Sequence, residues 1–214
     1  MKKCDHVIYV NDGQLTEPVS NPNNKYVYLP NFPEINTYVP ITKTKSKDIR
    51  VNYIGSLRDY DSLRCLLDLK HGKVQIGLYG TGICYDQLKK EYKNANIYGK
   101  YDGVKDSAKI YRNTDILYCV YNPNIENWKK ASPVKLFESI ITHTPIIVSK
   151  GTVAGNFVEE YSIGMTVDYN NSESLLKAIT EIKENYKSYV KNIEKISNNY
   201  NWDTIKSNLN KIYF

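Results

Sequence analysis

Hydrophobic positions fall in short apolar runs that alternate with amphipathic stretches of helical length. Each run and the stretch after it occupy about 20 to 30 residues, which is the spacing of repeated β-α units. Strands are predicted at residues 6–10, 26–29, 51–55, 74–80, 96–98, 115–121, 145–149 and 165–168. Helices are predicted at residues 60–70, 83–93, 104–112, 133–143, 153–161 and 172–186.

Several of the predicted strands are apolar almost throughout, as in ILYCV at 116–120 and PIIV at 145–148. A uniformly apolar strand is buried on both faces, which is typical of a parallel sheet with helices on each side. The pattern therefore predicts an α/β fold with a Rossmann-like, doubly wound parallel sheet.

One segment departs from this alternation. Residues 30–48 contain three prolines and a Lys/Thr/Ser run without sustained periodicity, which favours a linker. Residues 1–48 then hold two strands, their loop and this linker, too little to fold alone. Residues 49–188 form the main domain. Residues 189–214 are predicted as two helices, the second beginning near Asn201.

Composition narrows the classes of function. The 214 residues carry 29 basic and 23 acidic side chains, a net charge of +6, which suits phosphate or an anionic membrane surface as a partner. No run of about 18 apolar residues is present, which excludes a spanning segment. We expect a cytoplasmic protein with at most peripheral contact at the inner membrane face through lysine-rich helices after residue 172. A solvated helix face is the alternative.

Four cysteines stand at Cys4, Cys65, Cys84 and Cys119, too far apart for a CxxC pair. We expect them to be reduced thiols, which fits the cytoplasm, and we expect neither a metal site nor a nucleic-acid partner.

In an open parallel sheet, ligands bind beyond the carboxyl ends of the strands, so the strand-to-helix loops are the candidate sites. The first loop, Gly55-Ser56-Leu57-Arg58, offers backbone N–H groups and a guanidinium to an anion, with a tight turn as the alternative. The second, Tyr79-Gly80-Thr81-Gly82, lacks the third glycine of a dinucleotide fingerprint. Close backbone approach to a base or ribose and a plain turn remain open for it.

The third loop leads into the helix predicted at 133–143. Ser132 is expected as its N-cap and Pro133 as its first residue, which turns a helix N-terminus toward the ligand edge. Lys135 adds a positive charge there. Glu138, one turn further along an apolar helix, requires a partner. The spacing leaves two partners open, Lys135 itself or the two hydroxyls of a vicinal diol such as a ribose.

The segments VNYIGSLRDYDSL and SPVKLFESIITHTPIIVSKG, with the opening CDHVIYV and YVYLPNFPE, resemble the GT-B glycosyltransferases of family 4, the retaining "group 1" enzymes. The resemblance covers nearly the whole chain but only the C-terminal, donor-binding half of such an enzyme. It makes residues 1–48 a remnant of the N-terminal domain plus the linker. The closing NWDTIKSNLNKIYF resembles the C-terminal helix that packs back toward that domain.

The resemblance implies binding of a nucleotide-diphosphate sugar, with UDP favoured, no cofactor, and retaining transfer to a polysaccharide or glycolipid acceptor. A separate N-terminal glycosyltransferase half is then the implied partner. Glu138 would hold the ribose, and Arg58 and Lys135 the diphosphate. The remaining implied binding residues are Gly55, Ser56, Ser132, Pro133 and Val134 around the phosphates, and Gly80, Gly82, Tyr98 and Tyr101 around the base.

The chain departs from the family pattern at several positions. The arginine usual after the loop glycine is Ser56, and the lysine usual a turn later falls near Asp61. The first carboxylate of the E-x7-E pair is replaced by Lys130; Glu126 lies in the same loop. His143 stands where a glycine is usual and is expected to take a left-handed backbone at the helix end rather than a catalytic role.

Two other functions stay open from the sequence. The first is a non-catalytic nucleotide-sugar-binding or partner-docking module in which Glu138 is structural. The second is a nicotinamide-dependent oxidoreductase, against which the incomplete glycine fingerprint counts.

Overall fold

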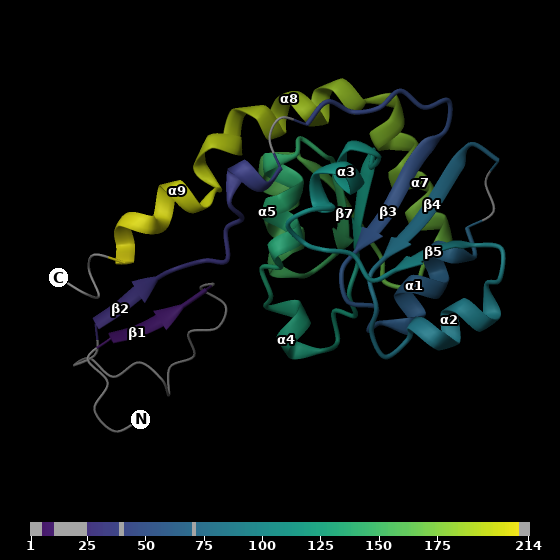
Figure 1. The fold of residues 1–214 in the computed structure, drawn as a ribbon, viewed down its shortest axis with the longest axis horizontal. Coiled ribbons are helices and arrows are strands. Elements are labelled where there is room, and N and C mark those ends of the chain that lie inside the picture. Colours follow the sequence, from purple (N-terminus) through teal and green to yellow (C-terminus); the bar gives the residue numbers. More distant parts are fainter. Residues whose placement is uncertain (1–5, 11–24, 39–40, 70–71, 210–214) are drawn as a thin grey trace.

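The computed structural model describes residues 6–10, 25–38, 41–69 and 72–209. Its centre is a six-stranded sheet in the order β5-β4-β3-β6-β7-β8 (Figure 1). Every neighbouring pair of these strands is parallel. The strands are β3 (Ile49–Ile54), β4 (Val74–Tyr79), β5 (Asn96–Gly99), β6 (Ile116–Cys119), β7 (Ile146–Ser149) and β8 (Gly164–Val167).

Helices cover both faces of this sheet, as predicted. One core contains side chains of α1 (Tyr60–Leu67), α2 (Tyr85–Glu91) and α7 (Ser172–Glu184). The opposite core contains side chains of α3 (Ser107–Arg112), α5 (Val134–Ile141), α6 (Val153–Tyr161) and α8 (Tyr186–Ile196). Strands β6 and β7 are buried at every residue, which is why their sequences are apolar throughout. The doubly wound parallel sheet is therefore confirmed.

The order of the strands indicates where a ligand crevice can form. From β3 the chain adds β4 and β5 on one side, then returns and adds β6, β7 and β8 on the other. The direction of winding thus reverses between β3 and β6. Ligands of open α/β sheets bind beyond the strand ends at this reversal. The loops after β3 and β6 are therefore the ones that can form a site.

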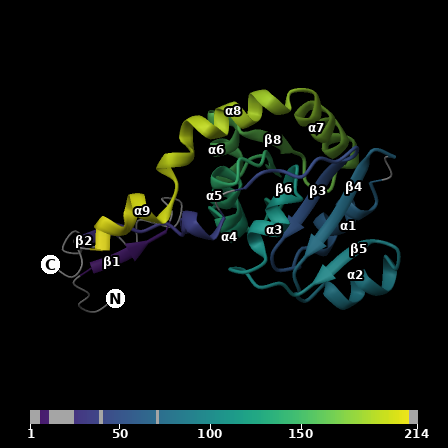
Figure 2. The same ribbon diagram turned by 45° about the horizontal axis from the view of Figure 1, so that its top comes forward.

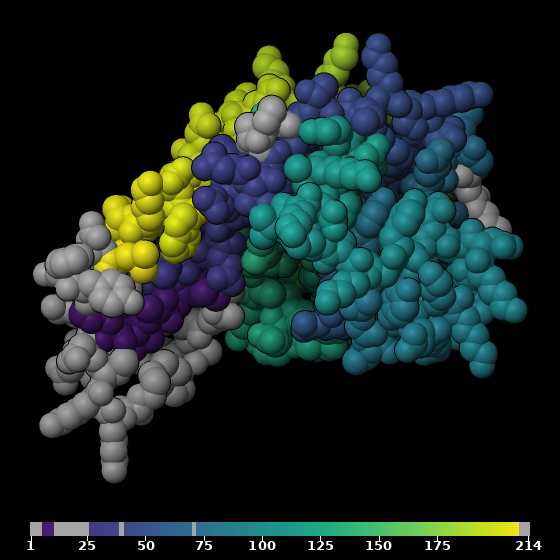
Figure 3. All heavy atoms as spheres, viewed as in Figure 1, coloured from purple at the N-terminus to yellow at the C-terminus, as the bar shows by residue number. Residues whose placement is uncertain are grey.

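The two predicted N-terminal strands are present as a separate parallel pair, β1 (His6–Tyr9) and β2 (Lys25–Tyr28). They lie beside α9 (Trp202–Ile205), away from the large sheet (Figures 1 and 2). The Asn208 amide donates to the Tyr28 carbonyl at 3.1 Å, and the Trp202 N–H to the Pro33 carbonyl at 3.0 Å. In the space-filling view β1, β2 and α9 form an arm that projects from the α/β body (Figure 3). The loop predicted between the strands lies outside the described residues.

A cluster of aromatic rings joins the linker and the C-terminal segment to the main domain. Phe32 lies 4.6 Å from Phe137 of α5 and 5.6 Å from Tyr200, measured between ring centres. Tyr200 also stacks on Phe137 at 5.9 Å and meets Phe157 of α6 edge-on at 5.2 Å. The segment before the main domain and the segment after it therefore meet on α5.

Some boundaries differ from the sequence prediction. The helix expected at 172–186 ends at Glu184, and α8 already begins at Tyr186, so the expected domain boundary after residue 188 falls inside α8. Asn185 separates the two helices, and its side chain donates to Glu181 at 2.7 Å. The structure also has short helices that periodicity does not predict. These are η3 (Ile35–Thr37), α4 (Glu126–Lys129), η4 (Ser197–Asn199) and η5 (Lys206–Leu209).

Within the described ranges, no helix is long and apolar enough to cross a bilayer. Of the four cysteines, Cys65, Cys84 and Cys119 are free and buried, and Cys4 lies outside the described residues. Burial raises the pKa of the Cys119 thiol, which leaves it protonated at neutral pH.

Candidate functional site

A cleft of about 590 Å³ opens beyond the ends of β3 and β6, and we call it the main cleft. Nine of the residues singled out from the sequence line it: Gly55, Ser56, Arg58, Tyr101, Ser132, Pro133, Val134, Lys135 and Glu138. Asn31, Ile54, Tyr121, Asn127, Trp128 and Ala131 complete the lining. A hollow of about 350 Å³ shares Gly55, Ser56 and Tyr101 with it and reaches Gly80. The volume of the main cleft is typical of small-molecule sites.

The loops after β3 and β4 pack backbone against backbone. The Gly55 N–H donates to the Tyr79 carbonyl at 2.8 Å, and the Leu57 N–H to the Thr81 carbonyl at 3.0 Å. A Cβ on Gly80 would lie 1.9 Å from the Gly55 oxygen, and one on Gly82 would lie 2.4 Å from the Leu57 oxygen. Contact between the two loops therefore accounts for both glycines, without a bound dinucleotide.

The loop after β3 is held by two side chains. The Tyr53 hydroxyl donates to the Ser56 carbonyl at 2.6 Å. Asp59 caps α1 by accepting from the Ser62 N–H at 3.2 Å, as an aspartate before a helix commonly does. Its carboxylate also accepts from the Asn122 N–H at 3.0 Å and the Tyr169 hydroxyl at 2.7 Å. Asp59 thus joins three loops at the carboxyl edge of the sheet.

Arg58 is exposed at the rim of the main cleft, and its Nε donates to the Ser56 hydroxyl at 3.0 Å. This leaves the remaining guanidinium N–H groups available to an anion in the cleft.

Helix α5 begins one residue later than predicted. Pro133 itself is the N-cap, with φ −68° and ψ 144°, and no side chain caps the helix. The expected N-cap role of Ser132 is therefore wrong, because the extended ψ of Pro133 places the first helical residue at Val134. The N-terminus of the helix nevertheless faces the main cleft, as predicted, since both Ser132 and Pro133 line it.

Lys135 does not pair with Glu138. Its Nζ lies 3.9 Å from the centre of the Tyr53 ring and 5.0 Å from that of Tyr121. Burial lowers the pKa of the Lys135 ammonium, but Tyr53, Cys119 and Glu138 raise it more, so the net direction is upward. The lysine therefore remains a cation at the floor of the cleft. A Cβ on Gly55 would lie 3.0 Å from Nζ, so the glycine lets the ammonium approach the loop.

Glu138 accepts hydrogen bonds from two tyrosines. The Tyr38 hydroxyl donates to Oε1 at 2.6 Å, and the Tyr111 hydroxyl donates to Oε2 at 2.7 Å. Tyr38 and Tyr111 are buried, and Glu138 itself is partly exposed where it lines the main cleft. Burial, and next the charge of Glu138, raises the pKa of both tyrosines, so both stay protonated donors.

The loop between β6 and α5 places Trp128 and Asn127 at the cleft. Glu126 instead forms an ion pair with Lys130, Oε1 to Nζ 2.7 Å, in which both side chains face solvent. Glu126 is therefore not among the residues that line the main cleft. His143 has a φ of 49°, the left-handed backbone predicted for it. Burial lowers the pKa of its imidazole.

Two residues assigned to the base, Tyr98 and Gly82, do not line the main cleft. Tyr98 stacks on Tyr79 at 4.4 Å in a third hollow, of about 470 Å³, on the face of β3, β4 and β5 beside α3. Gly82 lies under Leu57 and lines none of the three hollows. Tyr101 lines all three hollows, so it stands where they meet. Over the part of the chain that is described, no three His, Cys, Asp or Glu side chains gather as a metal site requires.

Known proteins match this chain by structure and not by sequence. No protein-family model matches the sequence, and a search of curated proteins gives no match. A sucrose-phosphate synthase from Thermosynechococcus elongatus superposes with a TM-score of 0.77 at 16% identity, over 99% of this chain and 58% of that one. Anabaena Alr3699/HepE, solved with UDP and glucose, gives a TM-score of 0.67 at 16% identity, over 90% and 56%. WaaG, a glycosyltransferase of lipopolysaccharide biosynthesis, gives 0.69 at 12%, over 95% and 60%.

These matches define the fold class. The chain has the α/β fold of one half of the GT-B glycosyltransferases of family 4, as the sequence resemblance implies. It spans 56–60% of the length of these three solved chains.

Proposed function

We propose that this chain is the donor-binding half of a retaining glycosyltransferase, and that a nucleotide-diphosphate sugar binds in the main cleft. The observation that carries the proposal is the convergence of Arg58, Lys135 and Glu138 on one cleft at the reversal of the sheet. The two cations are complementary to the diphosphate of such a ligand, and the carboxylate is complementary to its ribose. The diphosphate is anionic, and the ribose presents two neighbouring hydroxyl donors.

The diphosphate would lie between the Gly55 loop and the start of α5. Lys135 supplies a charge beside that helix start, and the N–H groups of an uncapped helix N-terminus favour an anion. Arg58 reaches the same space from the opposite loop. In a transfer reaction these cations would neutralise the leaving diphosphate.

The ribose would donate to Glu138. Its two oxygens each receive one tyrosine hydroxyl, and an ionised carboxylate has capacity for about four hydrogen bonds. The remaining capacity faces the main cleft, which Glu138 lines. Tyr101 at the meeting point of the three hollows would contact the base, with Tyr98 and Gly80 in the adjoining hollows.

UDP is the proposed nucleotide, since HepE was solved with UDP and with UDP-glucose. Transfer to a glycan or lipid-linked acceptor would require an N-terminal half, supplied by a separate chain or by a further part of the same protein. Co-expression with a neighbouring reading frame of that kind, followed by an assay of sugar transfer, tests this requirement.

Titration calorimetry with UDP and UDP-glucose tests the binding site directly. Glu138→Gln should weaken UDP binding by about tenfold or more, because the amide can accept at only one of its two positions. The matched control is Glu126→Gln, which removes a carboxylate outside the cleft and should leave affinity unchanged. Equal affinities for the two variants would refute the ribose assignment.

A non-catalytic nucleotide-sugar-binding module is the second candidate. It is favoured by Lys130, which replaces the first carboxylate of the E-x7-E pair and is engaged by Glu126 at 2.7 Å. Such a module would bind UDP-glucose as tightly but would show no transfer in the presence of an N-terminal half. Titration with NADH tests the more distant oxidoreductase, for which saturable binding is required.

A further inference from the structure

The two tyrosines on Glu138 come from different parts of the chain. Tyr111 lies on α3, and Tyr38 follows η3 in the segment that leads into the main domain. Their rings meet edge-on, with centres 5.7 Å apart, and both hydroxyls point at the same carboxylate. A residue 100 positions before Glu138 in the sequence thus fixes one of its oxygens.

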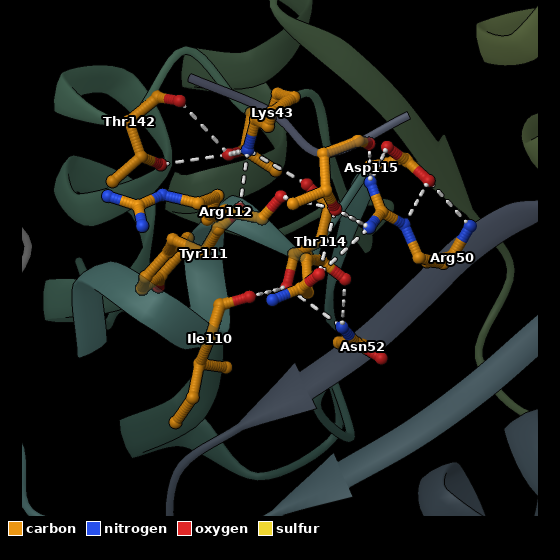
Figure 4. Close-up of polar contacts among 12 residues, drawn as sticks. Lys43, Arg50, Asn52, Ile110, Tyr111, Arg112, Thr114, Asp115 and Thr142 are labelled. Carbon is orange, nitrogen blue, oxygen red and sulfur yellow. Dashed lines mark hydrogen bonds and ion pairs between the residues drawn. The ribbon is translucent and has the colours of Figure 1, made fainter. Parts of the chain in front are cut away.

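Residues shortly after Tyr38 in the sequence contact α3, the helix that carries Tyr111. Residues 41–48, called here the linker segment, cross the C-terminal end of α3. Lys43 of this segment donates from Nζ to the carbonyls of Tyr111 and Thr114, both at 2.8 Å (Figure 4). The Thr44 N–H donates to the Arg112 carbonyl at 3.1 Å. The linker segment therefore holds the main chain of the residue whose hydroxyl holds Glu138.

The backbone of Glu138 belongs to the same network. The Thr142 hydroxyl donates to the Glu138 carbonyl at 2.7 Å and shares a hydrogen bond of 2.8 Å with Thr144. Thr144 in turn accepts from the Lys43 amine. Glu138 is thus connected to the linker segment at Oε2 through Tyr111 and at its carbonyl through Thr142 and Thr144. Its other oxygen, Oε1, is held by Tyr38.

We propose that Tyr38 and Tyr111 are positioning residues for Glu138, and that through Tyr111 and Lys43 the linker segment responds to a ligand on that carboxylate. This rests on the proposed nucleotide site. The two hydroxyls fix the plane of the carboxylate, so that its free lone pairs face the cleft. A ligand that orders Glu138 also orders the two tyrosines and, through Tyr111, the linker segment bonded to the end of α3.

A double-mutant cycle in UDP affinity tests the positioning role. Tyr38→Phe and Tyr111→Phe should each weaken UDP binding about tenfold, because each removes a donor to an ionised acceptor. In a Glu138→Gln background the same substitutions should have less than about a twofold effect. The control is Tyr161→Phe, whose hydroxyl contacts Tyr200 at 3.3 Å and should leave affinity unchanged.

The outcomes separate the two proposals. Loss of affinity in Glu138→Gln with unchanged affinity in both phenylalanine variants would overturn the positioning role alone. Unchanged affinity in Glu138→Gln itself would overturn the proposed function. Two phenylalanine variants are used so that one remains informative if the other does not fold.

Hydrogen exchange of the Thr44 amide, followed by NMR, tests the response of the linker segment. This N–H is bonded to the Arg112 carbonyl and lies outside the main cleft. Saturating UDP should slow its exchange several-fold in the unmodified chain and clearly less in Tyr111→Phe, also at saturation, because that variant loses the hydroxyl that joins Glu138 to the helix under Lys43 and Thr44. Equal slowing in both chains, or none in the unmodified chain, would overturn the coupling.

Discussion

The ammonium of Lys135 lies over the face of the Tyr53 ring, 3.9 Å from its centre. The same tyrosine donates its hydroxyl to the Ser56 carbonyl at 2.6 Å. One side chain therefore positions both the cation at the start of α5 and the loop after β3. The attraction between an ammonium and an aromatic face, together with the charge of nearby Glu138, keeps the lysine charged although it forms no ion pair.

Replacement of this lysine should affect phosphate binding selectively. Lys135→Gln is expected to weaken UDP binding by about tenfold to a hundredfold and to leave uridine binding nearly unchanged, because uridine carries no phosphate. Calorimetric titration with both compounds makes the comparison, and Lys129→Gln on α4 is the matched control for a lost surface charge. Equal losses for UDP and uridine would show that Lys135 supports the cleft without contacting phosphate.

Gly80 should tolerate no side chain. Gly80→Ala is expected to lower the free energy of unfolding by about 2 to 4 kcal/mol, since φ is 130° and the new Cβ would lie 1.9 Å from the Gly55 oxygen. Urea unfolding followed by circular dichroism measures the change. Gly103→Ala serves as control, because a Cβ there meets nothing within 4 Å. A comparable loss in the control variant would contradict the argument from loop packing.

Lys43 should make stability depend on pH. Burial lowers the pKa of its amine to about 7, whereas the unfolded chain has a value of about 10.4. Between these values the unfolded state binds more protons, so stability should rise with pH from about 7 to about 10. The cost of burying the charged amine is complete below that range and absent above it.

Lys43→Met removes this titration. Urea midpoints at pH 7 and pH 9.5 should therefore rise less in the variant than in the unmodified chain, and the difference between the two slopes isolates Lys43 from other groups. An identical pH dependence would show that the pKa of Lys43 is not lowered.

Removal of one partner from the ion pair between Arg50 and Asp115 should lower the stability of the fold. Arg50 Nη2 lies 2.7 Å from Asp115 Oδ1, and Nε lies 2.8 Å from Oδ2, with both side chains largely buried (Figure 4). Asp115→Ala is expected to cost about 3 kcal/mol, because it leaves a guanidinium without its counter-charge. Arg50→Met combined with Asp115→Leu should recover most of this loss in thermal unfolding. A double variant as unstable as the single one would contradict this account.

The sequence predicts the sheet and the edge at which the cleft forms, because both depend on local patterns. The eight predicted strands match β1 to β8, and the helix over 133–143 brings Lys135 and Glu138 to the cleft. The partners of Glu138 could not be predicted, since Tyr38 is brought to it by the path of the linker. Asp59 had a local signal, an acidic residue before a helix, but its contacts with Asn122 and Tyr169 depend on the completed sheet.

The ring cluster of Phe32, Phe137 and Tyr200 places α5 between the cleft and the segments before and after the main domain. Phe137 and Glu138 are adjacent on this helix; Phe137 packs in the ring cluster, and Glu138 lines the main cleft. A single peptide bond therefore separates the packing of these two segments from the carboxylate. A change in that packing needs no path through the rest of the domain to reach the cleft.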